Sequence, residues 1–364
     1  MNQQTQAMYD KMRAKLEKVV PDVELRIKAE IAVEINALKA ERNAVILGHN
    51  YMEPALFYSI PDFVGDSLDL SRKAAQTDKD VIVFCGVRFM AETAKLLNPT
   101  KTVLLPSEKA GCSLAASITA QDVRDLKARF PGVPVVTYVN TYADVKAESD
   151  ICCTSSNAMA VVESLKSDKV IFLPDEYLGG NVAREMGWNI IFPDALTPQP
   201  PLPITGEGGN ALTPQPPLPI TGEGGMMIGW RGRCEVHEKF TVNDIQTVRA
   251  QFPDVAVLSH PECSPDVTAA SDFSGSTNAM IKFVKESKAP QYLVLTECAM
   301  GDNIAAANPE KDMLRLCMVR CPHMNTITME DTLSALKLNR YVIEVPEDIR
   351  VRAARSVQRM IEIG

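Results

Sequence analysis

The chain has 364 residues, a length that fits two or three domains of ordinary size. Hydrophobic residues make up 46% of it, which is enough to bury a core and excludes a chain that is disordered throughout. The formal net charge of -8 excludes a general basic surface for nucleic acid or anionic membranes. The longest apolar run, around 81–87, fits a buried strand, and the first thirty residues lack the apolar stretch of a signal peptide. We expect a soluble protein of the cytoplasm, with no nucleic-acid or membrane partner.

Residues 1–43 are predicted to form a helical arm. Ile27, Ile31, Ile35 and Leu38 recur at spacings of four, four and three, which places them on one helix face. This face is expected to pack on the core.

After the arm, short apolar runs alternate with amphipathic stretches. The predicted strands are 44–47, 81–84, 102–105, 133–138, 170–173, 190–192, 255–258 and 292–295. The predicted helices include 68–75, 91–97, 120–130, 157–166 and 278–286, and 346–364 is expected to form a C-terminal helix that packs on the first domain. Such alternation indicates an α/β architecture with parallel sheets.

One segment interrupts this alternation. The 15-residue sequence ALTPQPPLPITGEGG occurs twice, at 195–209 and 211–225, within an insertion at 194–225 that holds eight prolines and six glycines. Proline favours extended backbone and paired glycines remain flexible, so a solvent-exposed loop is expected. A ligand for a partner that binds PxxP motifs is the alternative function of this segment.

A motif recurs three times along the rest of the chain. The segments 62–67, 150–155 and 272–277 each begin with Asp and carry a hydroxyl residue five positions later, where a helix is expected to begin. A predicted strand that ends in polar residues precedes each segment. Internal repetition of this kind indicates three similar α/β domains.

Three cysteines keep the same distance from this motif. Cys112 lies 50 residues after Asp62 and Cys321 lies 49 after Asp272. Cys234 lies 84 residues after Asp150, or 52 once the 32-residue insertion is left out. We therefore expect the three cysteines to converge on a pseudo-threefold axis. The proposed limits are an arm at 1–43 and domains at 44–114, 115–236 and 237–345.

Three thiols on such an axis can form a metal site or an apolar plug. Zinc accepts mixed ligands, which Cys234 with His237 or Cys321 with His323 can supply. An iron–sulfur cluster held by only three thiolates leaves one iron free to bind substrate as a Lewis acid. The repeated hydroxyls either cap helices or bind phosphate and carboxylates, with Arg42, Arg88, Arg233 and Lys239 as candidates to assist.

At this point the chain resembles the quinolinate synthase family of NAD biosynthesis. The segments that carry the resemblance are 48–51, 62–67, 110–112, 138–140, 153–157, 234–237, 260–263, 275–277 and 321–324. The resemblance covers about 43–364 without the insertion. It implies three pseudo-symmetric, three-layer α/β domains and one 4Fe-4S cluster held by Cys112, Cys234 and Cys321.

The resemblance also implies a reaction and a set of site residues. Iminoaspartate and dihydroxyacetone phosphate would condense to quinolinate, phosphate and water, with functional coupling to L-aspartate oxidase as the source of iminoaspartate. Tyr51, His260 and Glu262 would transfer protons. The substrate-binding residues would be His49, Ser67, Tyr138, Asn140, Ser155, His237, Ser276 and Thr277. A zinc-dependent hydrolase with Cys/His ligands and an iron–sulfur electron carrier are the alternatives.

Overall fold

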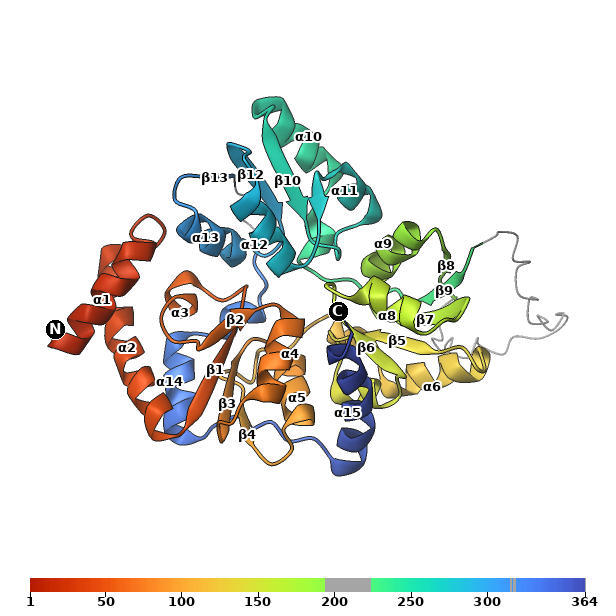
Figure 1. Cartoon of the computed structure of the whole chain (residues 1–364), viewed down its shortest axis with the longest axis horizontal. Coiled ribbons are helices and arrows are strands. Elements are labelled where there is room, and N and C mark those ends of the chain that lie inside the picture. The colour runs from red at the N-terminus through yellow and green to blue at the C-terminus, as the bar shows by residue number, and fades with distance from the viewer. Residues whose placement is uncertain (194–223, 315, 317–318, 364) are drawn as a thin grey trace, which may run out of the picture.

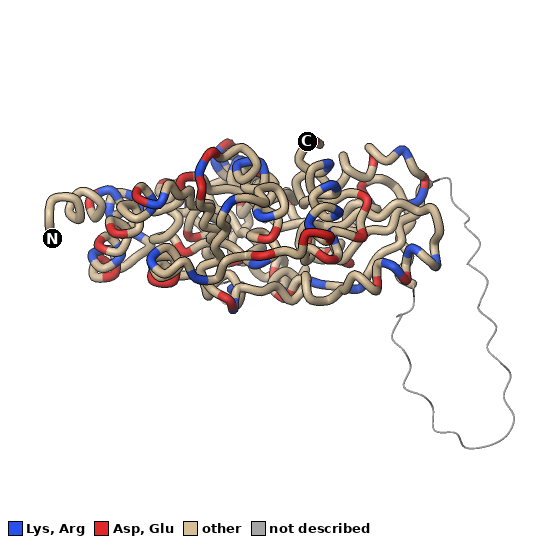
Figure 2. Tube along the Cα trace, turned by 90° about the horizontal axis from the view of Figure 1, so that it is seen from below, with Lys and Arg blue, Asp and Glu red and all other residues tan. Residues whose placement is uncertain are grey.

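The structure is a computed structural model of the chain, and it describes residues 1–193, 224–314, 316 and 319–363. Nearly all of the duplicated insertion, and Cys317, lie outside the described residues. Within them, no helix combines the length and the apolar character that a membrane span requires. Lys and Arg are interspersed with Asp and Glu along the trace (Figure 2).

The N-terminal arm consists of two helices, α1 (Gln3–Leu16) and α2 (Asp22–Glu41), rather than one. Pro21 is the N-cap of α2, a position at which a missing backbone N–H costs little. The prediction for the buried face was wrong in part, because Ile27 is 55% exposed. The buried positions of α2 are Leu25, Ala29, Ala32 and Ile35.

The strands form three separate sheets arranged around a common centre (Figure 1). The first sheet has the order β2 (Phe63–Gly65), β1 (Ala44–His49), β3 (Val81–Cys85), β4 (Thr102–Leu104). The second has the order β6 (Ile151–Cys153), β5 (Val135–Tyr138), β7 (Lys169–Leu173), β9 (Met226–Gly229), β8 (Asn189–Ile191). The third has the order β11 (Phe273–Ser274), β10 (Val255–Ser259), β12 (Gln291–Leu295), β13 (Asp312–Leu314).

Every pairing between these strands is parallel, which confirms the predicted α/β class. In each sheet the second strand in chain order lies at an edge, the first lies beside it and the third comes next. The second sheet then differs, because its last strand β9 lies between β7 and β8. Because the strands are parallel, their carboxyl ends lie on one side of each sheet, where ligands usually bind.

In each sheet, the aspartate of the repeated motif links the edge strand that follows it (β2, β6 or β11) to the strand beside it (β1, β5 or β10). Its Oδ2 atom accepts a hydrogen bond from a backbone N–H of the neighbouring strand in each sheet: Asp62 from Ile46 (2.8 Å), Asp150 from Val135 (2.7 Å) and Asp272 from Val257 (2.8 Å). The three equivalent contacts support the repeat inferred from spacing. They also explain why the motif begins with Asp, since a carboxylate reaches an N–H that the short edge strand leaves unpaired.

Helices cover the sheets on both sides. They are α3 (Pro54–Phe57), α4 (Ser67–Gln76), α5 (Arg88–Leu97), α6 (Ala120–Arg129), α7 (Ala143–Ala147), α8 (Ala158–Ser164), α9 (Glu176–Met186), α10 (Val242–Gln251), α11 (Pro265–Ala270), α12 (Thr277–Glu286) and α13 (Cys298–Ala307). Helices α4 and α12 begin at the repeated hydroxyl, as predicted. The prediction was wrong for Ser155, because α8 begins at Ala158 with Asn157 as its N-cap.

The last two helices return to earlier parts of the fold. Helix α14 (Met329–Leu338) packs on α2 and on β3 of the first sheet. Helix α15 (Glu347–Ile361) packs on α5 beside the first sheet and on α7 and β6 beside the second (Figure 1). Ser356 Oγ donates to the Lys146 carbonyl at 2.9 Å, and Arg72 Nε donates to the Ile361 carbonyl at 3.1 Å. The C-terminal helix therefore joins the first two sheets.

Candidate active site

Three equivalent loops leave the last parallel strands of the sheets and carry the cysteines. Each loop is fixed to the first residue of a helix, which donates its backbone N–H to the carbonyl two residues before the cysteine. The pairs are Arg88 with Ala110 (2.8 Å), Glu176 with Gly232 (2.8 Å) and Cys298 with Val319 (3.1 Å). The same backbone contact thus positions all three cysteines.

A single 3₁₀ turn follows each cysteine and begins three residues later. These turns are η1 (Ala115–Ser117), η2 (His237–Lys239) and η3 (Met324–Thr326). The Cys112 sulfur accepts the Ala115 N–H at 3.5 Å, and the Cys321 sulfur accepts the Met324 N–H at 3.5 Å. The Cys234 thiol likewise accepts a bond from the His237 backbone. Such N–H bonds stabilise a thiolate.

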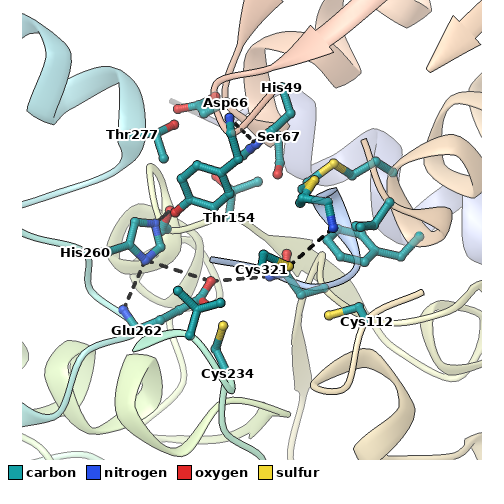
Figure 3. Close-up of a pocket in the computed structure, with 18 of the residues that line it drawn as sticks. His49, Asp66, Ser67, Cys112, Thr154, Cys234, His260, Glu262, Thr277 and Cys321 are labelled. Carbon is teal, nitrogen blue, oxygen red and sulfur yellow. Dashed lines mark hydrogen bonds and ion pairs between the residues drawn. The ribbon is translucent and has the colours of Figure 1, made fainter. Parts of the chain in front are cut away.

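The three thiols lie together at one end of a pocket between the sheets (Figure 3). Burial raises the pKa of the Cys112 thiol to about 12 and that of Cys321 to about 11, and it also raises the pKa of Cys234. A positively charged metal group would favour the thiolates against this burial. Three free cysteines with equivalent N–H bonds fit an iron–sulfur cluster that has three protein ligands.

The opposite end of the pocket is rich in hydroxyl groups. His49, Ser67 and Thr277 lie there (Figure 3). Asp66 caps α4 and accepts the Ser156 hydroxyl at 2.7 Å, which joins the first and second sheets. Asn50 Nδ2 donates to Thr277 Oγ1 at 2.8 Å, which joins the first and third. The N-termini of α4 and α12 thus meet at this end.

Glu262 connects side chains from the second and third sheets along one side of the pocket. It accepts hydrogen bonds from the Tyr138 hydroxyl, from Asn140 Nδ2 at 3.3 Å and from His237 Nδ1 at 2.9 Å. Burial alone would raise the pKa of this carboxyl, but the adjacent His237 holds it well below its usual range. Glu262 is therefore an ionised carboxylate although it is only 3% exposed.

Two buried histidines have their tautomers set by the backbone. The Tyr51 N–H donates to His49 Nδ1 at 3.2 Å, and the Glu262 N–H donates to His260 Nδ1 at 3.3 Å. Each ring therefore carries its proton on Nε2, which can donate to a ligand. Burial lowers the pKa of His49 to about 4 and that of His260 to about 3, so both rings are neutral at physiological pH.

Thr296 belongs to the site, although the sequence analysis missed it. Its Oγ1 lies 2.6 Å from the Tyr51 hydroxyl and 2.9 Å from His237 Nε2. Thr296 directly follows β12, so the rule that polar residues at the carboxyl ends of parallel strands gather at ligand sites could have found it.

The structure brings all the predicted site residues except Ser276 to the wall of this pocket. They are His49, Tyr51, Ser67, Cys112, Tyr138, Asn140, Ser155, Cys234, His237, His260, Glu262, Thr277 and Cys321. Ser276 instead caps α12 by accepting the Ala279 N–H at 3.4 Å. Asp66, Thr154 and Ser156 also line the pocket and were not predicted.

The four basic residues that were candidates to assist do not line the pocket. Arg88 pairs with Glu92 at 2.8 Å, and Arg233 pairs with Glu176 at 2.9 Å. Arg42 Nη2 donates to Asn339 near the end of α14, and Lys239 is exposed. Among the described lining residues none is Lys or Arg, so hydroxyls, histidine N–H groups and helix N-termini must hold an anion.

One group of described residues has the spacing of a mixed metal site. Ligand atoms of Cys234, His237 and Glu262 lie within 4.8 Å of one another. However, both ring nitrogens of His237 already have partners, in Glu262 and Thr296. In the second predicted zinc ligand pair, Cys321 with His323, the Nε2 atom of His323 is likewise occupied, because it lies 3.2 Å from Glu235 Oε1.

Comparison with known proteins decides between the alternatives. Residues 33–362 match the family model described as "Quinolinate synthetase A protein". The chain belongs to the quinolinate synthase family. It is 49% identical to "Quinolinate synthase 2" of Mesorhizobium japonicum over 98% of this chain and 97% of that protein. It is 46% identical to quinolinate synthase of Agrobacterium fabrum over 100% of this chain and 94% of the relative.

Quinolinate synthase of Xylella fastidiosa is 48% identical over 93% of this chain and 89% of that protein. Membership confirms the predicted family, and the zinc hydrolase alternative finds no support. Quinolinate synthases are enzymes of NAD biosynthesis with an iron–sulfur cofactor, and the three equivalent thiols are suited to such a group.

Proposed function

We propose that this chain condenses iminoaspartate with dihydroxyacetone phosphate to give quinolinate, phosphate and water in the pocket between its three sheets. The observation that carries the proposal is the polarity of this pocket. Three equivalent thiols lie at one end and hydroxyl groups with two helix N-termini lie at the other. A multiply anionic substrate can therefore be held next to a metal group.

Cys112, Cys234 and Cys321 would hold one 4Fe-4S cluster. When bound by three cysteines, a cluster of this kind supplies one Lewis-acidic iron for a substrate oxygen or nitrogen. The protein's contribution is to fix the three thiolates, and the repeated N–H···S bonds from the following turns do so.

The hydroxyl-rich end would bind the phosphate and carboxylate groups. Ser67 and Thr277 are the first residues of ten-residue helices, whose free N–H groups and partial positive charge favour anions. Ser155 lies 3.3 Å from His260 Nε2, so both can bind one carboxylate oxygen. Since His49 and His260 are neutral N–H donors, they bind anions without adding charge.

Proton transfer would use Glu262 and Tyr51. Glu262 is ionised, and Tyr138 and Asn140 orient it, so its carboxylate can accept a proton as the general base, and the low pKa that His237 imposes makes it a weak base. Burial raises the pKa of Tyr51 well above its usual value, so the phenol stays protonated and can donate its O–H, although as a weak acid. His260 would hydrogen-bond a developing negative charge through its Nε2–H.

We also propose that the enzyme acts in the cytoplasm, coupled functionally to an L-aspartate oxidase that supplies the iminoaspartate. Water hydrolyses an imine readily, so delivery close to the site would limit the loss of iminoaspartate.

We also propose domain limits at 44–114, 115–236 and 237–345. Helices α14 and α15 pack back against the part of the chain that belongs to the first sheet.

The experiment that tests the function is quinolinate formation by protein purified and assayed without oxygen. Iminoaspartate would be generated in situ and dihydroxyacetone phosphate added. Quinolinate that appears only when both substrates are present would support the proposal. Protein that contains iron and sulfide but forms no quinolinate would contradict it.

A further inference from the structure

A polar contact outside the pocket lining links the three cysteine loops. It consists of Ser113, Glu235 and His323, each one or two residues after a cysteine. Ser113 Oγ donates to Glu235 Oε1 at 2.8 Å, and His323 Nε2 lies 3.2 Å from the same oxygen. One carboxylate oxygen of the second loop therefore meets the first and third loops.

These three residues stand outside the lining of the pocket. None is among the described residues that line it, although Cys112, Cys234 and Cys321 all are. The Glu235 and His323 side chains are 34% and 29% exposed, and Ser113 is exposed. The contact is therefore partly open to solvent.

The ring of His323 rests against the first cysteine loop. A Cβ atom on Gly111 would lie 3.7 Å from His323 Nδ1 and 3.6 Å from the Tyr142 hydroxyl, which approaches from α7. Two side chains from other sheets thus cover the residue before Cys112. A larger residue at position 111 would crowd both of them.

Glu235 also places a negative charge beside the cysteines, because it directly follows Cys234 and its Oε1 contacts the other two cysteine loops. Removing that charge would stabilise the more negative, reduced state of a bound cluster, because net charge near the cluster sets its reduction potential.

We propose that Glu235 is a positioning residue. Its carboxylate binds Ser113 and His323, holds the three cysteine loops together and thereby helps the enzyme to retain its metal group. The proposal rests on the proposed function, since it assumes that the three cysteines hold a cluster. Partners of metal ligands typically change affinity by about 10–100-fold when they are removed. An exposed ion pair, in contrast, contributes little to folding.

The test measures iron release without oxygen. Wild type, Glu235→Gln and Glu235→Ala are mixed with a ferrous chelator, and loss of the cluster absorbance is followed in the absence of substrate. We expect release to be about tenfold faster for Glu235→Ala, with Glu235→Gln between it and wild type because the amide keeps an acceptor oxygen. Glu238→Ala, an exposed carboxylate three residues further on, should match wild type.

Two further measurements separate positioning from general damage. In a double-mutant cycle, His323→Ala should add little to Glu235→Ala because both remove the same contact. The reduction potential of Glu235→Gln should move to a more positive value. Iron release at the wild-type rate in both Glu235→Ala and His323→Ala would overturn the proposed positioning role of Glu235. A wild-type protein without iron would instead overturn the proposed function.

Discussion

His237 Nδ1 lies 2.9 Å from Glu262 Oε2, and this contact joins the loop that carries Cys234 to the end of β10. The carboxylate must accept, so His237 Nδ1 carries a proton and donates it, and Nε2 of the same ring lies 2.9 Å from Thr296 Oγ1. Thr296 Oγ1 in turn lies 2.6 Å from the Tyr51 hydroxyl. A hydrogen-bonded chain thus runs from Tyr51 to Glu262 along the pocket wall.

Replacing Glu262 by Gln should lower kcat by about 10²–10⁴-fold, because the amide keeps the shape but cannot take a proton. KM should change much less, since the anion-binding hydroxyls lie at the other end of the pocket. Steady-state kinetics of quinolinate formation measure both parameters. Glu238→Gln is the matched control, and a variant at position 262 with nearly wild-type kcat would exclude the carboxylate as base.

Thr296→Val should lower kcat by roughly tenfold, because valine has the shape of threonine but breaks the chain between Tyr51 and His237. Thr296→Ser keeps the hydroxyl and should restore most of the rate. The comparison uses the same assay, with thermal unfolding as a check on the fold. Equal rates for Val and Ser would show that the hydroxyl takes no part.

Stability should fall between pH 7 and pH 5 in a way that depends on His49. Its pKa is about 4 in the folded state, lowered by burial, against about 6.5 in the unfolded chain. The unfolded state therefore binds more protons below pH 6.5, which costs about 2 kcal/mol at pH 5. His49→Asn keeps an acceptor for the Tyr51 N–H. Between pH 7 and pH 5 its free energy of unfolding, measured by chemical denaturation, should fall by about 2 kcal/mol less than that of the wild type. An unchanged difference would contradict the buried neutral ring.

Asp150→Ala should lower the free energy of unfolding by about 1–3 kcal/mol, because it leaves the Val135 N–H without the carboxylate that it now binds. Asp150 does not line the pocket, so the substrate-binding residues should stay in place and the effect on KM should be small. Denaturant unfolding of this variant is compared with Asp254→Ala, an exposed aspartate. Equal stability of the two variants would remove the structural explanation for the repeated aspartate.

The repeat could be predicted because its residues act locally and equivalently. Asp62, Asp150 and Asp272 each fix an edge strand to its neighbour, and each cysteine follows at a similar distance. A stronger signal was overlooked. Thr119, Thr241 and Thr328 each stand seven residues after a cysteine, and each caps a helix by accepting an N–H from the Asp three residues on.

Other features could not be predicted because they depend on contacts between distant segments. Strands β2, β6 and β11 have only two or three residues, too few for an alternating pattern to appear. Ser155 follows the motif, yet Asn157 caps α8 and leaves that hydroxyl free for His260. The contacts Asn50–Thr277 and Ser113–Glu235 join residues more than 100 positions apart, and no local pattern specifies them.

The central claim is that three equivalent cysteines hold a cluster, and metal analysis of protein purified without oxygen tests it most directly. Wild type and Cys152→Ala should contain about four irons and four sulfides per chain, the content of a 4Fe-4S cluster. Cys152 is buried and donates to Ser356 Oγ, away from the pocket wall. Cys112→Ala, Cys234→Ala and Cys321→Ala should each lose the cluster and the activity. About one zinc per chain without sulfide, or full iron and sulfide in these three variants, would contradict the account.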